Sequence, residues 1–178
     1  TRPAGVELNH TKPVFTPDGS AVIALVEESR MTHLSRVDLA TGEVTGLTSG
    51  PRFDFDFDTA ANGRIAVLGG DDLHLYRIEA VDVKQEGTVT FASEQAKVTV
   101  PRVIADHNEW LKDRKLASVE PIEFKSADGT PIHGFLVKPV DYVAGKRYPT
   151  ILRIHGGPVY QFSHEFMEDW QVLAANGY

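Results

Sequence analysis

The sequence predicts β-propeller blades followed by the first part of an α/β-hydrolase domain, together an incomplete portion of a larger two-domain protein. Three observations lead to this fold class: a repeat of short strands in the first hundred residues, a change of character after Pro101, and a Gly-Gly loop between an apolar run and an amphipathic helix. We expect a propeller portion of about two blades at 1–104. A linking helix and connector at 105–121 and the start of the hydrolase domain at 122–178 then follow.

The strand repeat is the evidence for the blades. Gly19 and Gly63 are turn residues 44 positions apart, and the similar segments at Leu34 and Leu75 are 41 positions apart. A four-strand unit that recurs every ~40 to 45 residues is typical of a propeller blade, and a closed ring takes about four to eight blades. We therefore expect further blades outside this chain, although a small β-sandwich with a chance repeat stays open as an alternative. The strands are predicted at 21–27, 34–39, 44–47, 53–57, 64–68, 73–78 and 88–91.

The region after Pro101 mixes helix and strand signals. Asp106, with Glu109 three residues later, has the spacing of a capping box and predicts a helix at 107–115, against which we expect Trp110 to pack. The turn at 127–130 predicts a hairpin between 122–125 and 132–138.

Two further elements are predicted near the C-terminus. The apolar run 151–154 is typical of a buried strand. From Ser163 onward, apolar residues recur at helical spacing until Asn176 and Gly177 end the pattern, which predicts an amphipathic helix.

Composition excludes several classes of function. The 178 residues include 18 Lys and Arg against 25 Asp and Glu, for a formal net charge of −7, and 42% of the residues are hydrophobic. This acidic balance, without a basic cluster, argues against a nucleic-acid partner, and no apolar run reaches the roughly 20 residues that span a bilayer. The absence of Cys excludes disulfides and thiolate catalysis. Neither terminus has the features of a complete chain, so both are expected to be internal to a longer protein. The compartment, whether cytoplasmic, periplasmic or secreted, stays open.

The chemistry is expected at His155-Gly156-Gly157-Pro158, between the predicted strand and the predicted helix. Adjacent glycines allow backbone torsions closed to other residues and let a substrate approach closely. A backbone N–H in such a loop can stabilise the oxyanion of a tetrahedral intermediate, as the corresponding loop does in α/β-hydrolases. A plain Gly-Gly turn with a structural His is the alternative reading.

Four stretches, in order, resemble the start of the catalytic domain of the prolyl oligopeptidase family of serine peptidases, especially its acylaminoacyl-peptidase and dipeptidyl-peptidase-like branch. The resemblance covers roughly residues 105–178. The stretches are FKSADGTPIHGFLVKP at 124–139, YPTIL at 148–152, HGGP at 155–158 and AANGY at 174–178.

The resemblance implies a serine-type peptidase that hydrolyses short peptides, with a propeller covering the hydrolase domain. By position, Gly157 matches the glycine whose N–H contributes to the oxyanion hole, while His155 shapes the loop and is not the triad histidine. The family's Ser, Asp and His follow downstream, and no Ser here stands in G-x-S-x-G, so this stretch alone is expected to be inactive. No cofactor and no metal is implied. The expected partners are peptide substrates and the rest of the same polypeptide, with homo-oligomerisation left open.

Two other functions stay open. A carboxylesterase would use the same loop but leaves the repeat unexplained, whereas a propeller binding module fused to a non-catalytic hydrolase domain would lack the downstream triad.

Several acidic groups are interpreted as structural. Asp54, Asp56 and Asp58 resemble the start of a calcium loop, but the required glycine and glutamate are missing. We therefore expect a propeller strand with Phe53, Phe55 and Phe57 buried and the aspartates facing water or the central channel. The pairs Glu27-Glu28 and Asp71-Asp72 are interpreted as solvated charges. A role in binding a peptide amino terminus, which the resemblance suggests, is the alternative. The His spacing gives no support to metal catalysis.

Overall fold

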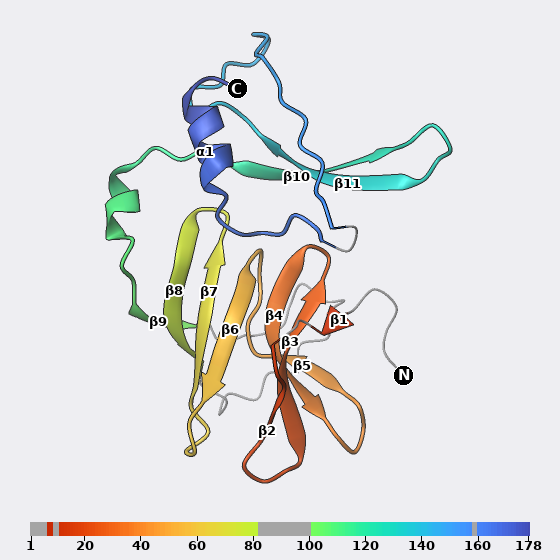
Figure 1. Cartoon of the computed structure of the whole chain (residues 1–178), viewed down its shortest axis with the longest axis vertical. Helices are drawn as coiled ribbons and strands as arrows, with labels where there is room; N and C mark the ends of the chain where they lie inside the picture. The colour runs from red at the N-terminus through yellow and green to blue at the C-terminus, as the bar shows by residue number, and fades with distance from the viewer. Residues whose placement is uncertain (1–6, 9–10, 82–100, 158–159) are drawn as a thin grey trace. The chain divides into compact units, whose positions relative to one another are not determined.

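A computed structural model describes residues 7–8, 11–81, 101–157 and 160–178 (Figure 1). The chain divides into two compact units. The first comprises Thr1–Asn108 with Ser163–Glu165, and the second comprises Glu109–Phe162 with Phe166–Tyr178. The predicted domain boundaries at 104 and 121 remain predictions. In the described part, no helix is long and apolar enough to cross a membrane.

The first unit contains a nine-stranded sheet made of two consecutive antiparallel meanders. Strands β2 to β5 pair in sequence order to form one meander, and β6 to β9 form the other. A single parallel pairing between Thr32 and Phe53 joins them. The predicted four-strand repeat is thereby confirmed. The strands are β1 Glu7–Leu8, β2 Val14–Phe15, β3 Ala21–Glu28, β4 Met31–Asp38, β5 Val44–Gly46, β6 Phe53–Thr59, β7 Ile65–Asp71, β8 His74–Val81 and β9 Arg102–Ala105.

The strand predicted at 88–91 lies outside the described residues. Among the described strands, Arg102–Ala105 pairs with β8 and is the fourth strand of the second meander.

Equivalent turns open both meanders and account for the repeat. Gly19 and Gly63 have φ of 68° and 78°, a region that glycine enters without steric cost. In each turn the glycine N–H donates to the carbonyl three residues earlier. The preceding side chain, Asp18 or Asn62, accepts the N–H two residues further on. These local bonds fix the hairpin register, so the sequence spacing of the two glycines reports the spacing of the blades.

The core of the first unit lies where the strands of both meanders contribute large aliphatic side chains. Leu34 and Val67 are fully buried, and the partly buried Val14 and Leu47 pack against this cluster. Its members are Ile23, Leu25, Leu34, Phe57, Ile65, Val67 and Val81.

The expected alternation along β6 is wrong in its first half. Asp54 is completely buried and Phe55 is 51% exposed, although Phe57 is buried and Asp58 exposed as expected. The cause is a break in the β6–β7 register between Asp54 and Asp56, since an extra residue in a strand reverses the side-chain alternation beyond it.

Partners compensate the burial of Asp54. Its carboxylate accepts the backbone N–H of Leu34 at 3.0 Å and the Nε–H of Arg52 at 2.8 Å, and it also accepts the hydroxyl of Thr48. Arg52 in turn donates to Glu79 at 2.7 Å. A buried charge is tolerated only with such partners, and here they come from both meanders.

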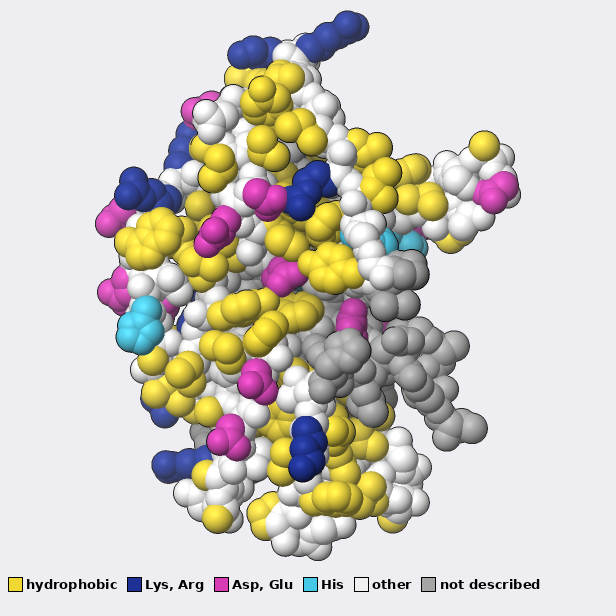
Figure 2. All heavy atoms as spheres, in the orientation of Figure 1, with side chains coloured by type: hydrophobic (Ala, Val, Ile, Leu, Met, Phe, Trp, Pro, Cys, Tyr) yellow, Lys and Arg dark blue, Asp and Glu magenta, His cyan; other side chains and the backbone are white. Residues whose placement is uncertain are grey.

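The second unit contains one hairpin. Strands β10 (Val119–Lys125) and β11 (Pro131–Val137) pair over seven residues, and their turn has Gly129 at φ 86°. The predicted hairpin is confirmed. Hydrophobic side chains remain partly at the surface of the hairpin (Figure 2). Phe124, for example, is 54% exposed.

The predicted helices are shorter in the structure. The first is only a 3-10 helix at Glu109–Asp113, and the side chain of Glu109 pairs with Lys112. Trp110 lies on this helix with 53% of its surface exposed, and the prediction that it packs the helix instead of binding a ligand remains a prediction. The second, α1, begins at Glu168 instead of Ser163 and ends at Ala175.

The predicted strand at 151–154 is absent from the second unit. Leu152 and Ile154 are each 82% exposed, and among the described strands β10 and β11 pair only with each other. A buried strand needs a hydrogen-bonded neighbour on at least one side, and no described strand pairs with this run. The apolar composition therefore does not produce a strand here.

Candidate functional site

The Gly-Gly loop has backbone geometry that requires glycine at one of its two positions, Gly157. Gly157 adopts φ 123°, which side-chain-bearing residues rarely adopt, and a Cβ built on Gly156 would meet no atom within 4 Å. Both residues are exposed. Pro158, the last residue of the predicted loop, lies outside the described residues. The need for glycine is therefore conformational at Gly157, while Gly156 leaves open space beside it.

The side chain of His155 is held by aromatic neighbours. Its ring lies edge-on to Phe162, with centroids 6.0 Å apart at 88°, and to Tyr160 at 6.4 Å and 68°. Edge-to-face pairs at these distances are favourable. These contacts agree with the prediction that His155 shapes the loop. The role of the loop in chemistry remains a prediction.

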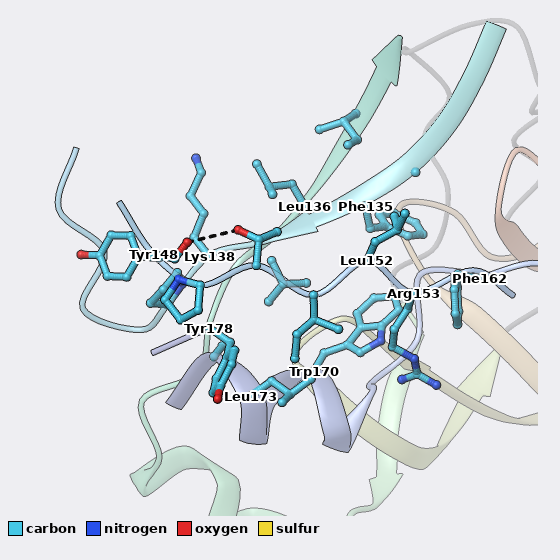
Figure 3. Close-up of a pocket in the computed structure, with 18 of the residues that line it drawn as sticks. Phe135, Leu136, Lys138, Tyr148, Leu152, Arg153, Phe162, Trp170, Leu173 and Tyr178 are labelled. Carbon is cyan, nitrogen blue, oxygen red and sulfur yellow. Dashed lines mark hydrogen bonds between the residues drawn. The ribbon is translucent and has the colours of Figure 1, made fainter. Parts of the chain in front are cut away.

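Phe162 connects this histidine to helix α1. Its ring packs on Trp170 at 5.2 Å and 71°, and Trp170, only 8% exposed, also contacts Phe135 of β11 at 6.0 Å. The guanidinium of Arg153 lies over the Phe162 ring, 5.5 Å from its centroid, and forms an ion pair with Asp169 in the first turn of α1. Figure 3 shows Arg153, Phe162 and Trp170 side by side. The residues before and after the Gly-Gly loop are thus both attached to this helix.

A cavity of about 620 Å³ lies beside the loop within the second unit (Figure 3). Its wall is formed by the hairpin, the run 148–155 and α1, and it is largely apolar, with Leu136, Leu152 and Leu173 among the lining side chains. His155 is among the lining residues, and the described lining holds no Ser, Asp or Glu that could act with it as nucleophile or acid. In the described residues, no three His, Cys, Asp or Glu side chains gather to hold a metal ion.

The acidic pairs differ in environment. Asp71 caps the β7–β8 turn by accepting the N–H groups of Leu73 and His74, and it pairs with the His74 ring at 2.8 Å. Asp72 is not a solvated charge as expected: its side chain is only 16% exposed, and its Oδ2 lies 2.7 Å from Nδ1 of His164. No local sequence pattern predicts this pair, because 92 positions separate its members.

No family model matches the chain. Among curated proteins, an uncharacterized peptidase of Bacillus subtilis, YuxL, is 33% identical over 72 residues, which cover 40% of this chain and 11% of that protein. Dipeptidyl-peptidase 5 of Porphyromonas gingivalis is 24% identical over 184 residues, covering 95% of this chain and 24% of that protein. The chain therefore spans a quarter or less of these two relatives.

Solved structures share the fold. Acylaminoacyl peptidase in complex with Z-Gly-Gly-Phe-chloromethyl ketone superposes with a TM-score of 0.76 at 20% identity, over 99% of this chain and 24% of that one. Acylaminoacyl peptidase of Pyrococcus horikoshii gives 0.74 at 21% identity with the same coverage. These matches and the peptidase relatives confirm the resemblance to the prolyl oligopeptidase family that the sequence predicts.

Proposed function

We propose that this chain is part of a serine peptidase of the prolyl oligopeptidase family, in which it supplies blades of the propeller and the oxyanion loop of the hydrolase domain. The observation that carries the proposal is the conjunction of two four-stranded meanders with a Gly-Gly loop whose Gly157 has φ 123°. The similarity to peptidases over 95% of this chain, at 24% identity, supports it.

In the proposed mechanism, the triad of Ser, Asp and His comes from sequence beyond this chain. The Ser hydroxyl attacks the peptide carbonyl while His removes its proton and Asp orients the His ring. The N–H of Gly157 donates to the oxygen of the tetrahedral intermediate, together with the N–H of the residue after the Ser. Gly157 contributes stabilisation of negative charge and takes no part in proton transfer.

Short peptides are the proposed substrates because a propeller over the catalytic domain restricts entry to thin, extended chains. The two meanders favour this function over a carboxylesterase, which needs only the loop. A binding module without a triad predicts the same meanders but no reaction with a serine-directed probe.

The test uses the full-length protein, peptide hydrolysis and labelling by a fluorophosphonate, which reacts only with an activated serine. Gly157→Pro removes the N–H and should lower kcat by about 10²–10³ or more, the usual cost of one oxyanion donor. Gly157→Ala keeps the donor but strains the backbone, so its loss should be smaller. Gly145→Ala is the matched control, since Gly145 also has positive φ (83°) and open space around it in the second unit.

Two results would contradict the proposal. A folded Gly157→Pro variant with the turnover of the original protein would remove Gly157 from the mechanism. A full-length protein inert to both the probe and peptides would favour the binding module.

A further inference from the structure

The tetrapeptide Ala-Ala-Asn-Gly occurs twice in the chain, at 60–63 in the first unit and at 174–177 in the second. In both copies the Asn is exposed and the Gly has positive φ, 78° at Gly63 and 87° at Gly177. In both, the Gly N–H donates to the carbonyl of the first Ala, at 2.9 Å and 3.2 Å respectively. The two copies therefore share sequence, exposure and a backbone bond, and they differ in what the Asn side chain does.

In the turn between β6 and β7, the side chain of Asn62 is an acceptor. Its Oδ1 accepts the backbone N–H of Arg64 at 3.1 Å. A donor on this oxygen makes the amide carbon, Cγ, easier to attack, because negative charge develops on the oxygen during the attack. The neighbouring nucleophile is the backbone nitrogen of Gly63, where a Cβ would meet no atom within 4 Å and where glycine leaves the approach open.

At the end of α1, the side chain of Asn176 is a donor instead. Its Nδ2 donates to the carbonyl of Val172 at 2.8 Å, one helical turn earlier. This bond holds the nitrogen that would have to leave if the amide reacted. A carboxylate at this position would lose the bond and would place negative charge at the C-terminal end of a helix, which the helix dipole disfavours.

We propose that Asn62 is a site of spontaneous deamidation, and that Asn176 in the same tetrapeptide is protected. Solvent base removes the proton of the Gly63 N–H, and the nitrogen forms a bond to Cγ of Asn62. The bond from Cγ to Nδ2 then breaks, and ammonia leaves with a proton from water. Water opens the resulting succinimide ring, at one carbonyl to give aspartate and at the other to give isoaspartate.

Two other hairpin turns show that the aspartate product fits. Asp18 and Asp128 occupy the position of Asn62 in their own turns, each before a glycine with positive φ. Each accepts the N–H two residues further on at 3.0 Å. Hydrogen bonds, first those from the hydroxyls of Thr16 and Ser126, lower the pKa of these two carboxyl groups to about 2. Deamidation of Asn62 to aspartate therefore keeps the acceptor that the turn uses and adds one negative charge to the blades.

The test is incubation of the full-length protein in mildly alkaline buffer, followed by proteolytic digestion and mass spectrometry of the two Ala-Ala-Asn-Gly peptides. In the folded protein, Asn62 should deamidate about tenfold faster than Asn176, the ratio that one ordinary hydrogen bond supplies. In urea, which removes both the turn and the helix, the two rates should become nearly equal.

A matched pair of variants tests whether each copy accepts the product. Asn62→Asp should keep the urea midpoint of the original protein, because the acceptor of the turn remains. Asn176→Asp should unfold at a lower urea concentration, because the bond to Val172 is lost.

Three results would overturn the proposal. The first is a rate at Asn62 in the folded protein that is no higher than the rate at Asn176. The second is a rate difference that persists unchanged in urea, since it would then arise from the flanking residues and not from the turn. The third is a large loss of stability in Asn62→Asp, which would show that the turn rejects the product.

Discussion

The two compact units differ in how far the apolar side chains of their strands are buried. In the first unit, consecutive strands of each meander are hydrogen-bonded neighbours, and seven core side chains from five strands pack together. In the described part of the second unit, β10 and β11 pair only with each other, and Phe124 and Leu136 remain partly exposed. The apolar run 151–154 forms no strand at all.

This difference shows what an apolar run needs in order to become a strand. A meander supplies each strand with a partner from the adjacent hairpin, so local turns are sufficient to assemble it. A strand of a parallel sheet needs neighbours reached through long crossover connections. Hydrophobicity alone therefore predicts the strands of the first unit but not the state of residues 151–154.

The largest loss of stability is expected from Asp54→Ala in the first unit. The change removes the acceptor of Arg52, Thr48 and the Leu34 N–H and leaves a buried guanidinium with Glu79 as its remaining partner. Breaking a buried ionic network in this way costs about 3–5 kcal/mol. Urea unfolding, monitored by far-UV circular dichroism, measures this loss of stability.

The control for that change is Asp56→Ala on the same strand. Asp56 is exposed, and its carboxylate accepts only the N–H of the next residue, Phe57. The loss of stability in Asp56→Ala should stay within about 0.5 kcal/mol. Equal losses at the two positions would mean that the register break does not bury Asp54.

A Leu→Ala substitution in each unit directly tests this difference in burial. Leu34→Ala opens a cavity in the core of the first unit and should cost about 2–5 kcal/mol, whereas Leu152→Ala removes an 82% exposed side chain and should change stability by less than about 0.5 kcal/mol. Both tryptophans, Trp110 and Trp170, are in the second unit, so their fluorescence follows that unit while circular dichroism is dominated by the blades. A large loss at Leu152 would show that the run 151–154 is buried in solution.

Local signals account for what the sequence predicts well. Turn glycines at 19, 63 and 129 fix three hairpins, and the side chains of Asp18, Asn62 and Asp128 each accept the N–H two residues further on. Both the glycine torsion and the side-chain bond are encoded within four residues. The blades and the β10–β11 hairpin follow from them.

Other features depend on contacts that no local pattern encodes. The burial of Asp54 arises from a register break between two strands, and the Asp72–His164 pair joins positions 92 apart. The candidate site divides in the same way: the Gly-Gly motif marks the loop, while its attachment through Phe162 and Trp170 depends on the path of the backbone into α1.

Gln171→Met tests how the interior of the second unit is held. Gln171 is buried on α1, where its amide accepts the N–H of Ala117 at 2.7 Å and donates to the carbonyl of Ala117 at 3.1 Å. Methionine has a similar length but leaves both backbone groups unpaired, so a loss of about 1–3 kcal/mol is expected in the tryptophan fluorescence transition. Val172→Ala, at a 60% exposed position of the same helix, is the control and should remain close to the original protein. An unchanged midpoint in Gln171→Met would mean that water replaces both bonds.

The smallest change in stability is expected from the substitution of His33, a buried histidine of the first unit. Burial lowers its pKa from 6.5, only partly opposed by the contact of its Nε2 with the Gly50 carbonyl at 2.8 Å and by the charge of Asp54. The unfolded chain therefore takes up a proton below about pH 6.5 that the folded chain resists, so the stability contributed by neutral His33 is present above that pH and declines as the pH falls. In His33→Gln, whose amide can still donate to Gly50, the urea midpoint between pH 7 and pH 5 should fall less steeply than in the original protein. All other titrating groups are common to both proteins, so parallel pH curves would show that His33 gains its proton equally well in the folded and unfolded chains.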